Sequence, residues 1–357
     1  MSLNIKQYLG QGKVPLGLLA GKSIDHIELK VGKPAVIHLN DGDAIAPTCL
    51  HCPDQPCYKY PISETSSSLA SKFKVDNSLN TCANGAIKWN FDNSHPEIEA
   101  ESCVLCGVCV SRCPSKAIHL TPLGAVLSQD EVSPVFFPEN PEKTFSHKAT
   151  NEMLNQSNLK GAWMVEDVAI ATEALDRLKN FSGKASTLLP NILFRNLLRA
   201  LNIEAESYAQ GVQYSSVDIL FRIGERYGAA EVELGNAAID VPRNLAGDVA
   251  VLAARYEMPK DLETLSLVNR LPQGREQYWM VIDDMEKVLG LKIRTLTILC
   301  LYLLVWNNKK LVLQNDLFLA SEIHLIGLRE SMESLLSRKI NLPIGFENQF
   351  EPSKLVE

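Results

Sequence analysis

The sequence predicts two parts of different fold class, an α+β module near the N-terminus and a larger α/β domain with a mixed central sheet. Eight of the nine cysteines fall between Cys49 and Cys113, and the rest of the chain contains only Cys300. A proline-rich, polar stretch follows, and from about residue 162 apolar residues recur with alternating helical and strand spacing. A chain of 357 residues is long enough to build two hydrophobic cores.

Composition places the chain among ordinary globular proteins. Hydrophobic residues make up 46% of it, charged residues 22%, and the formal net charge is −7. Negative charge offers no general attraction to nucleic acid, so any such binding must depend on a local patch. No signal peptide is recognisable at the start. The longest apolar run, residues 298–306, is too short to span a bilayer, so we expect a buried strand there and no membrane association.

The first 121 residues are expected to form one domain of strands and cysteine-bearing loops. Moderate alternation of apolar residues predicts strands at residues 27–31 and 35–39, with a tight turn at residues 40–43. A hairpin is expected between residues 87–91 and 97–101, and a short strand at residues 117–120.

The best domain boundary is expected at residues 122–160. This stretch has prolines at positions 122, 134, 138 and 141 among many polar residues, which is typical of a linker or a wrapping arm. Residues 161–357 then form the second expected domain. Its predicted helices are residues 162–180, 188–201, 244–256, 277–288 and 321–336, and its predicted strands are residues 216–223, 229–234, 295–306 and 310–313.

The second half of the cysteine stretch has a spacing that binds iron–sulfur clusters. Cys103, Cys106, Cys109 and Cys113 follow the pattern C-x2-C-x2-C-x3-C, and Pro114 comes next. In this pattern three thiolates wrap one face of a cubane cluster, and the fourth ligates a second cluster.

The first half is a modified copy of the second. Cys49, Cys52 and Cys57 follow C-x2-C-x4-C, and Cys82 comes after a gap of 24 residues that contains a polar insertion at residues 63–80. The run that starts at Cys82, Cys-Ala-Asn-Gly-Ala-Ile, aligns with Cys-Pro-Ser-Lys-Ala-Ile from Cys113, which reveals an internal repeat.

These residues resemble the bacterial dicluster ferredoxins over about residues 45–121. The resemblance implies two [4Fe–4S] clusters and assigns their ligands as two sets: Cys49, Cys52, Cys57 and Cys113, and Cys103, Cys106, Cys109 and Cys82. Zinc is the alternative, because C-x2-C pairs also bind zinc, but eight cysteines with this spacing favour iron–sulfur clusters. Cysteines gathered in one segment are typical of metal ligation in a reducing compartment, so we expect a cytoplasmic protein.

Three carboxylates form the second candidate site. Asp218 lies on one predicted strand, and Glu231 and Glu233 share a face of the next because alternate side chains of a strand point the same way. If the two strands pair as a hairpin, the three carboxylates converge among apolar neighbours. Such a group would suit Mg²⁺ or Mn²⁺, and a metal-bound water can attack a phosphodiester. The alternative is a solvent-facing group of acidic residues on an edge hairpin.

The order of predicted elements over about residues 185–325 resembles the PD-(D/E)xK superfamily of restriction-endonuclease-like proteins. The resemblance implies that Asp218 and Glu231 ligate the metal and that Asp218, Glu231 and Glu233 are catalytic. Glu233 stands where this family usually has lysine, and the preceding helix carries Arg195 and Arg199 in place of the frequent glutamate.

Arg195 and Arg199 are candidate nucleic-acid-binding residues because a spacing of four places them on one helix face. The hypothesis is therefore a metal-dependent nuclease that acts on DNA in restriction, defence or repair and carries clusters in a structural or redox-sensing role. An electron-transfer protein whose C-terminal domain docks a redox partner is one alternative. A catalytically degenerate nucleic-acid-binding regulator is another. The sequence leaves the oligomeric state open.

Overall fold

The computed structural model describes most of the chain, in two compact units. The described residues are 2–3, 24–28, 36–39, 49, 52, 54–61, 69, 74–92, 95–113, 117–121, 124–129, 168–182, 188–209, 217–235, 238–259, 261–274, 276–313, 317–318, 327–337, 339–340 and 345–352. The first unit comprises Met1–Ile62, Leu79–Leu178 and Val305–Asn308. The second unit comprises Ser63–Ser78, Lys179–Leu304 and Lys309–Glu357.

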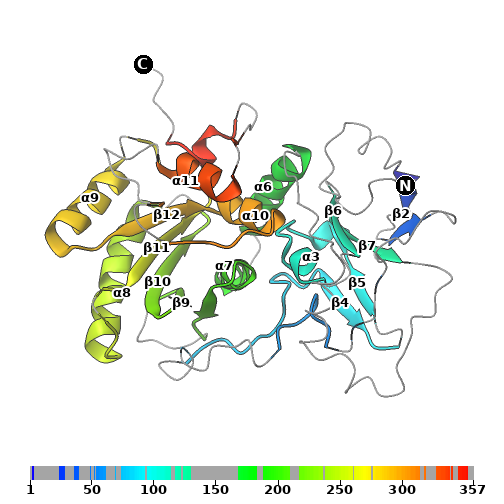
Figure 1. The fold of residues 1–357 in the computed structure, drawn as a ribbon, viewed down its shortest axis with the longest axis horizontal. Helices are drawn as coiled ribbons and strands as arrows, with labels where there is room; N and C mark the ends of the chain where they lie inside the picture. The colour runs from blue at the N-terminus through cyan, green and yellow to red at the C-terminus, as the bar shows by residue number, and fades with distance from the viewer. Residues whose placement is uncertain are drawn as a thin grey trace. The chain divides into compact units, whose positions relative to one another are not determined.

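The first unit contains a five-stranded mixed sheet and a separate hairpin (Figure 1). The sheet order is β1 (Ser2–Leu3), β2 (Ile24–Glu28), β3 (Val36–Leu39), β7 (Gly124–Gln129) and β6 (Ile118–Thr121). Its pairs are antiparallel except for β3 with β7. The hairpin joins β4 (Ile87–Asn90) to β5 (His95–Ile98). The helical segments of this unit are η2 (Ala100–Ser102), α3 (Val108–Arg112) and α6 (Val168–Ser182).

Six residues at the start of the expected linker, residues 124–129, form strand β7. Strand β7 pairs with β6 on one side and with β3 on the other, so residues 124–129 belong to the sheet of the first unit. The many polar residues of the surrounding stretch concealed this short strand. Residues 130–160 lie outside the described residues, as does the turn expected at residues 40–43.

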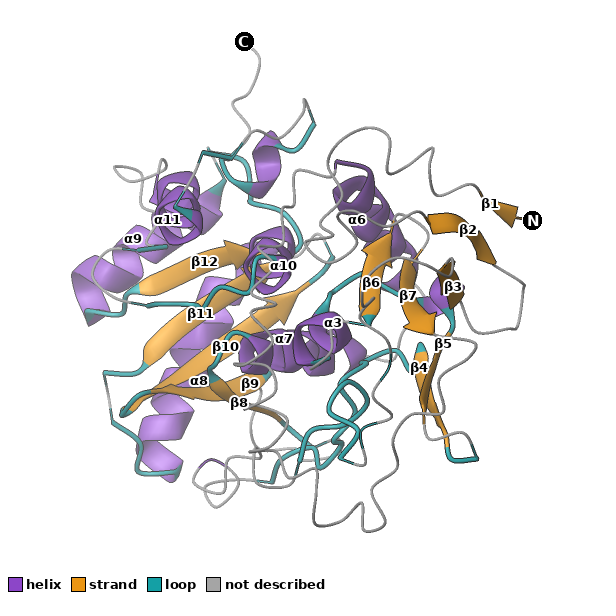
Figure 2. Cartoon of the chain, turned by 45° about the vertical axis from the view of Figure 1, so that its right-hand side comes forward, coloured by secondary structure: helices purple, strands orange, loops and turns teal. Residues whose placement is uncertain are grey.

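The second unit is an α/β structure around a mixed sheet. Its order is β12 (Ile293–Thr297), β11 (Glu263–Val268), β10 (Arg226–Glu233), β9 (Ile219–Ile223) and β8 (Glu204–Ser207). The first three strands are parallel to one another, and β10, β9 and β8 run antiparallel as a meander. Figure 2 shows α7 in front of this sheet and α8 behind it. The helices are α7 (Leu188–Ala200), α8 (Val241–Arg255), α9 (Gln277–Leu289), α10 (Ile298–Trp306) and α11 (Gly327–Leu336), with η3 (Ala238–Asp240) and η4 (Glu347–Gln349). The last two residues of α10, Val305 and Trp306, belong to the first unit.

The expected strand at residues 295–306 is wrong over most of its length. The strand ends at Thr297, and the apolar run that follows is helix α10. Each of its nine residues is at most 2% exposed. A run that is buried on every side has no helical periodicity, so its sequence cannot be told from that of a buried strand. Cys300 therefore lies in a helix, although it is fully buried as expected.

Strand prediction also missed two members of the sheet of the second unit. Strand β8 precedes β9, and β11 separates α8 from α9. The observed order from α7 to β11 is therefore one helix, three strands, a second helix and a further strand. Residues 310–313, an expected strand, are not in a strand in the part of the chain that the structure describes.

The polar insertion between Cys57 and Cys82 extends the second unit. Val75 forms an antiparallel bridge with Tyr208, next to the end of edge strand β8. The N–H of Asp76 donates to the carbonyl of Ser207 over 2.9 Å, and the N–H of Ala209 donates to that of Lys74 over 3.1 Å. Because these bonds use the free edge of β8, the insertion covers a sheet edge that would otherwise expose unpaired backbone groups.

In the described part of the chain, every helix is either too short or too polar to cross a membrane.

Candidate functional site

Four cysteines of the first unit form one thiol group. Burial raises the pKa of Cys52, and the charges of Cys113, Asp54 and Cys49 add to this effect. Burial likewise raises the pKa of Cys57, with further contributions from Cys113, Cys49 and Cys52. These mutual effects require the thiols to lie near one another. The group is therefore Cys49, Cys52, Cys57 and Cys113, each at most 9% exposed.

The other four cysteines line a common cavity in the same unit. This cavity is bordered by Cys82, Cys103, Cys106 and Cys109, together with apolar side chains such as Ile87, Ile98 and Val104. Burial raises the pKa of Cys82 to about 11, and the charge of Cys103 contributes. Burial also raises the pKa of Cys106, with contributions from Cys82 and Cys103. The last cysteine of each half of the repeat thus lies with the first three cysteines of the other half.

Backbone amides donate to the sulfurs in an arrangement that follows the internal repeat. The N–H of Ala86 donates to Cys82 Sγ over 3.2 Å, and the N–H of Ala117 donates to Cys113 Sγ over 3.3 Å. Both bonds join a cysteine to the residue four positions later. Ala86 and Ala117 occupy equivalent positions when the two halves of the repeat are aligned. The two halves therefore share this hydrogen bond as well as their sequence pattern.

The chemistry of this donor set suits iron–sulfur clusters. All nine cysteines are free thiols. Burial raises the pKa of six of the clustered ones, which are Cys52, Cys57, Cys82, Cys103, Cys106 and Cys109, so a cation would be needed to hold them as thiolates. Thiolate ligands are soft and favour iron–sulfur clusters or zinc. In the described residues, no three His, Cys, Asp or Glu side chains are arranged to hold one metal ion. A cubane spreads its ligands over four iron atoms, so its sulfurs lie farther apart than those around a single zinc ion.

Residues 96–119 match the protein family described as "4Fe-4S binding domain". The matched segment contains Cys103, Cys106, Cys109 and Cys113. The chain is therefore an iron–sulfur protein with a 4Fe-4S binding domain in its first unit. Neither the curated proteins nor the solved structures contain a match to this chain.

Three side chains that sequence reasoning missed hold the cysteine loops. The indole N–H of Trp306 donates to the carbonyl of Leu105 over 3.0 Å. Nη1 of Arg177 donates to the carbonyl of Cys103 over 2.9 Å. Nε of Arg112 donates to the carbonyl of Pro56 over 2.7 Å, and its guanidinium lies 4.1 Å from the ring centroid of Tyr60. Only Arg112, which directly precedes Cys113, carried a signal in the sequence.

The carboxylate site is built at the start of the β9–β10 hairpin. Strand β9 starts one residue after Asp218, and the pairing of Ile219 with Ala230 carries Asp218 alongside Glu231. Asn191 Nδ2 donates to Asp218 Oδ1 over 2.7 Å, and the N–H of Val232 donates to Oδ2 over 2.9 Å. Burial raises the pKa of Asp218 despite these donors, and the charge of Glu233 adds to the rise. The predicted hairpin is confirmed, and it brings Asp218 and Glu231 together.

Glu231 is the most perturbed carboxyl of this site. Its side chain comes from β10 and accepts a hydrogen bond from Asn244 Nδ2, on α8, over 3.0 Å. Burial raises the pKa of Glu231 to about 9, and the charges of Asp218 and Asp248 contribute. Glu231 is 7% exposed, and among the described residues its buried Oε2 has no hydrogen-bond partner. A cation beside this oxygen would restore its charge and occupy the open acceptor.

The expected convergence of three carboxylates is not found. Glu233 folds back onto its own chain, where one carboxylate oxygen accepts the N–H of Gly235. The described residues contain no set of three potential ligands for one ion, as stated above. Asp218 and Glu231 thus lie together at the site, while the carboxylate of Glu233 is turned toward Gly235. Asn191, Asn244 and Asp248 complete the surroundings of the site, but asparagine and aspartate on predicted helices gave no signal in the sequence.

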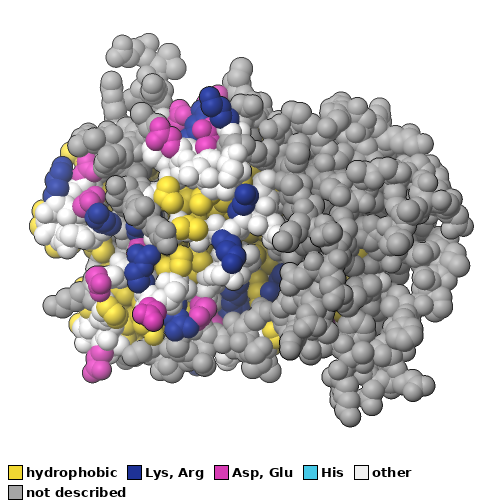
Figure 3. All heavy atoms as spheres, in the orientation of Figure 1, with side chains coloured by type: hydrophobic (Ala, Val, Ile, Leu, Met, Phe, Trp, Pro, Cys, Tyr) yellow, Lys and Arg dark blue, Asp and Glu magenta, His cyan; other side chains and the backbone are white. Residues whose placement is uncertain are grey.

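The structure places the candidate nucleic-acid-binding residues Arg195 and Arg199 in ion pairs within the second unit. Arg195 is fully buried and pairs with Asp76 over 2.9 Å. Arg199 pairs with the buried Glu206 over 2.8 Å. Both side chains point into the protein because α7 presents this face to β8 and the insertion. Figure 3 shows acidic and basic side chains intermixed over the visible face of the second unit.

Proposed function

We propose that the first unit binds two [4Fe–4S] clusters. One would be held by Cys49, Cys52, Cys57 and Cys113, and the other by Cys82, Cys103, Cys106 and Cys109. The separation of the thiols into these two sets supports the proposal. Iron and sulfide analysis of anaerobically purified protein should give about eight of each per chain. About four iron atoms and four sulfides per chain would instead indicate a single cluster.

We further propose that the second unit is a metal-dependent nuclease acting on DNA. The observation that carries this proposal is the buried, unpartnered Oε2 of Glu231 beside Asp218. The order of one helix, three strands, a helix and a strand agrees with the restriction-endonuclease-like resemblance. The clusters would then have a structural or redox-sensing role, and a reducing cytoplasm would preserve them.

The residues of the site would position a bound ion and its substrate. Asn191 and the N–H of Val232 fix the Asp218 carboxylate, and Asn244 fixes that of Glu231. A bound Mg²⁺ or Mn²⁺ ion would supply Lewis acidity and a water of lowered pKa. Two carboxylates are enough for Mg²⁺, which usually retains several waters and accepts substrate phosphate oxygens. Glu233, displaced toward Gly235, is left as the group that could accept a proton from water.

Cutting by the purified holoprotein tests the nuclease proposal. Plasmid and oligonucleotide substrates should be cut in Mn²⁺ or Mg²⁺, and Asp218→Asn or Glu231→Gln should reduce the rate at least about 100-fold. Glu225→Gln is the matched control, because Glu225 is an exposed carboxylate at the turn of the same hairpin. A holoprotein that cuts no nucleic acid, or unchanged cutting by both site variants, would refute the proposal.

A nucleic-acid-binding regulator without catalysis is the second candidate. The orientation of Glu233 toward Gly235 favours it, because among the described residues no three carboxylates are arranged around one ion. This candidate predicts DNA binding that is insensitive to Mg²⁺ and no cutting. An electron-transfer protein would instead show reversible reduction of its clusters by a redox partner, unaffected by Asp218→Asn.

A further inference from the structure

A polar pocket lies at the carboxyl ends of the parallel strands β10 and β11. It is lined by Gly235, Ala238, Arg270, Leu271, Pro272, Gln273, Glu276 and Asn348, and we call it the strand-end pocket. Gly235 follows β10 by two residues, and Arg270 follows β11 by two. In open α/β sheets, ligands commonly bind beyond the carboxyl ends of the strands. The cavity volume is about 80 Å³, which leaves room for a small group and lies below the range of pockets that enclose whole ligands.

We propose that the strand-end pocket binds a phosphodiester group of a nucleic-acid strand, with Arg270 as its anchor. This inference rests on the proposed function, because it gives the candidate nuclease site a substrate-binding subsite. It also replaces Arg195, which is fully buried, and Arg199, whose guanidinium pairs with the buried Glu206.

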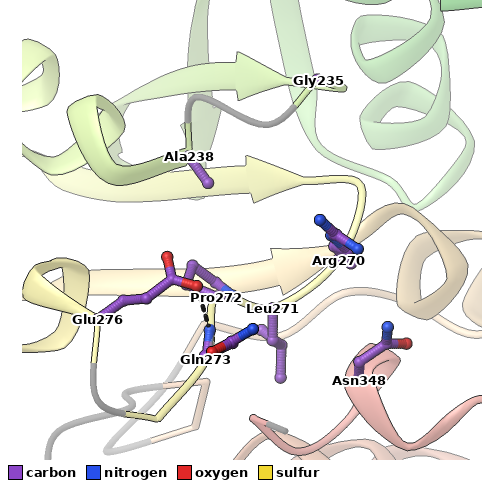
Figure 4. A pocket seen from close by; sticks show the side chains of 8 residues that line it. All are labelled: Gly235, Ala238, Arg270, Leu271, Pro272, Gln273, Glu276 and Asn348. Atoms are coloured by element: carbon purple, nitrogen blue, oxygen red, sulfur yellow. Dashed lines mark hydrogen bonds between the residues drawn. The ribbon is translucent and has the colours of Figure 1, made fainter.

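The groups around the pocket suit a phosphodiester. Arg270 is exposed, and its guanidinium presents the forked donors that match phosphate oxygens. Figure 4 shows Arg270, Gln273 and Asn348 around the hollow, with Glu276 beside Gln273. The two amides can bond to sugar or base edges. The lining holds one cationic and one anionic side chain, so a singly charged phosphodiester fits better than free phosphate with its higher charge.

The carboxylate of Glu276 accepts a hydrogen bond from the pocket wall, which lessens its repulsion of an anionic ligand. Glu276 Oε1 accepts the backbone N–H of Gln273 over 2.8 Å, as the dashed line in Figure 4 marks. The carbonyl of Gln273 in turn accepts the indole N–H of Trp279 over 3.0 Å. On the opposite side, the N–H of Leu271 donates to the carbonyl of Asn348 over 2.9 Å. These bonds fix the walls before any ligand arrives.

The strand-end pocket borders the end of β10, the strand that carries Glu231. The carboxylate of Glu233 accepts the N–H of Gly235, which lines the pocket. The main-chain carbonyl of Glu233 accepts the N–H of Asn269, the residue before Arg270, over 3.0 Å. Strand β10 therefore carries Glu231 inside the candidate metal site and ends at the strand-end pocket. A strand held by Arg270 would run past the candidate metal site.

Oligonucleotide binding in EDTA tests this proposal apart from cutting. Fluorescence anisotropy with a labelled oligonucleotide of about 20 nucleotides should show about 10-fold weaker binding for Arg270→Ala, with a salt slope reduced by about one. Asn348→Ala should weaken binding less, and it provides a second test if Arg270→Ala misfolds. Arg243→Ala is the matched control, because Arg243 is an exposed arginine on α8 outside the pocket, and it should bind as the wild type does.

The outcomes separate this inference from the proposed function. Binding that depends on Arg270 in a protein that never cuts supports the pocket and refutes the nuclease. Cutting by a protein whose binding is unchanged by Arg270→Ala and Asn348→Ala supports the nuclease and overturns the pocket. The pocket is also overturned if the wild type binds no oligonucleotide, or if inorganic phosphate at about 1 mM displaces the oligonucleotide.

Discussion

The indole N–H of Trp306 donates to the carbonyl of Leu105 over 3.0 Å, and these residues are 201 positions apart in the chain. Leu105 lies between Cys103 and Cys106 and has a positive φ of 60°, a backbone conformation that is uncommon for a residue other than glycine. Trp306 ends α10 and is 1% exposed. A side chain that is distant in the sequence thus fixes the loop that carries Cys103, Cys106 and Cys109.

Removal of the indole donor should therefore loosen this loop. We expect Trp306→Phe to weaken loop anchoring by about 1 kcal/mol, the typical net value of one hydrogen bond. Clusters should then be lost several-fold faster in air, measured as the decay of the iron–sulfur absorbance. Trp279→Phe is the control, because it also removes a buried indole–carbonyl bond but lies in the second unit. Equal decay rates for the two variants would contradict this role of Trp306.

Gly107 provides an independent test of the same loop. Its φ is +77°, and an added Cβ would lie 2.6 Å from Cδ1 of Trp306. Gly107→Ala should therefore impose both backbone strain and a steric clash, and we expect the iron content of the purified protein to fall by half or more. Gly85→Ala is the control: Gly85 has a φ of +70° but nothing within 4 Å of the added atom. Similar iron content in the two variants would show that contact with Trp306 is unimportant.

The sequence predicted those features that depend on local spacing. The cysteine repeat, the hairpin around β4 and β5, and the β9–β10 hairpin with Asp218 beside Glu231 follow from short-range patterns. Features that depend on distant packing were not predictable. Helix α10 has no polar face to reveal its period, and Arg195 reads as a surface residue until the insertion buries it. The hydrogen bond from Trp306 to the cysteine loop likewise becomes visible only in the folded structure.

The ion pair of Arg195 with Asp76 should stabilise the second unit. Arg195 Nη1 lies 2.9 Å from Asp76 Oδ1, and Nη2 donates to the carbonyl of Ser78 over 3.1 Å. Asp76→Asn would leave a fully buried guanidinium without its carboxylate. We expect a loss of about 2 kcal/mol in the free energy of unfolding, measured by urea denaturation at pH 7. Asp240→Asn is the control, because its pair with Arg243 is exposed and should contribute nothing measurable.

The pH dependence of this loss follows from the pKa of Asp76. Burial alone would raise that pKa, but hydrogen bonds from Ser78 and Arg195 and the charge of Arg195 hold it below its ordinary value of 3.8. A carboxyl whose pKa is lower in the folded state than in the unfolded state stabilises the fold at every pH above its unfolded-state pKa. This stabilisation is lost as the pH falls through the folded-state pKa. The difference between wild type and Asp76→Asn should thus be equal at pH 8 and pH 5 and shrink only below about pH 4. A difference that already changes between pH 8 and pH 5 would point to another group.

Cys300 should be chemically inert although it is a free thiol. Burial raises its pKa to about 12, despite hydrogen bonds with Thr297. At pH 8 the thiolate fraction would then be on the order of 10⁻⁴, and no path leads a reagent to a side chain that is 0% exposed. Iodoacetamide treatment of the holoprotein at pH 8, followed by peptide mass spectrometry, should leave Cys300 unmodified while added glutathione reacts fully. Labelling should become complete in strong denaturant. Rapid labelling in the native protein would mean that α10 opens readily, which its complete burial opposes.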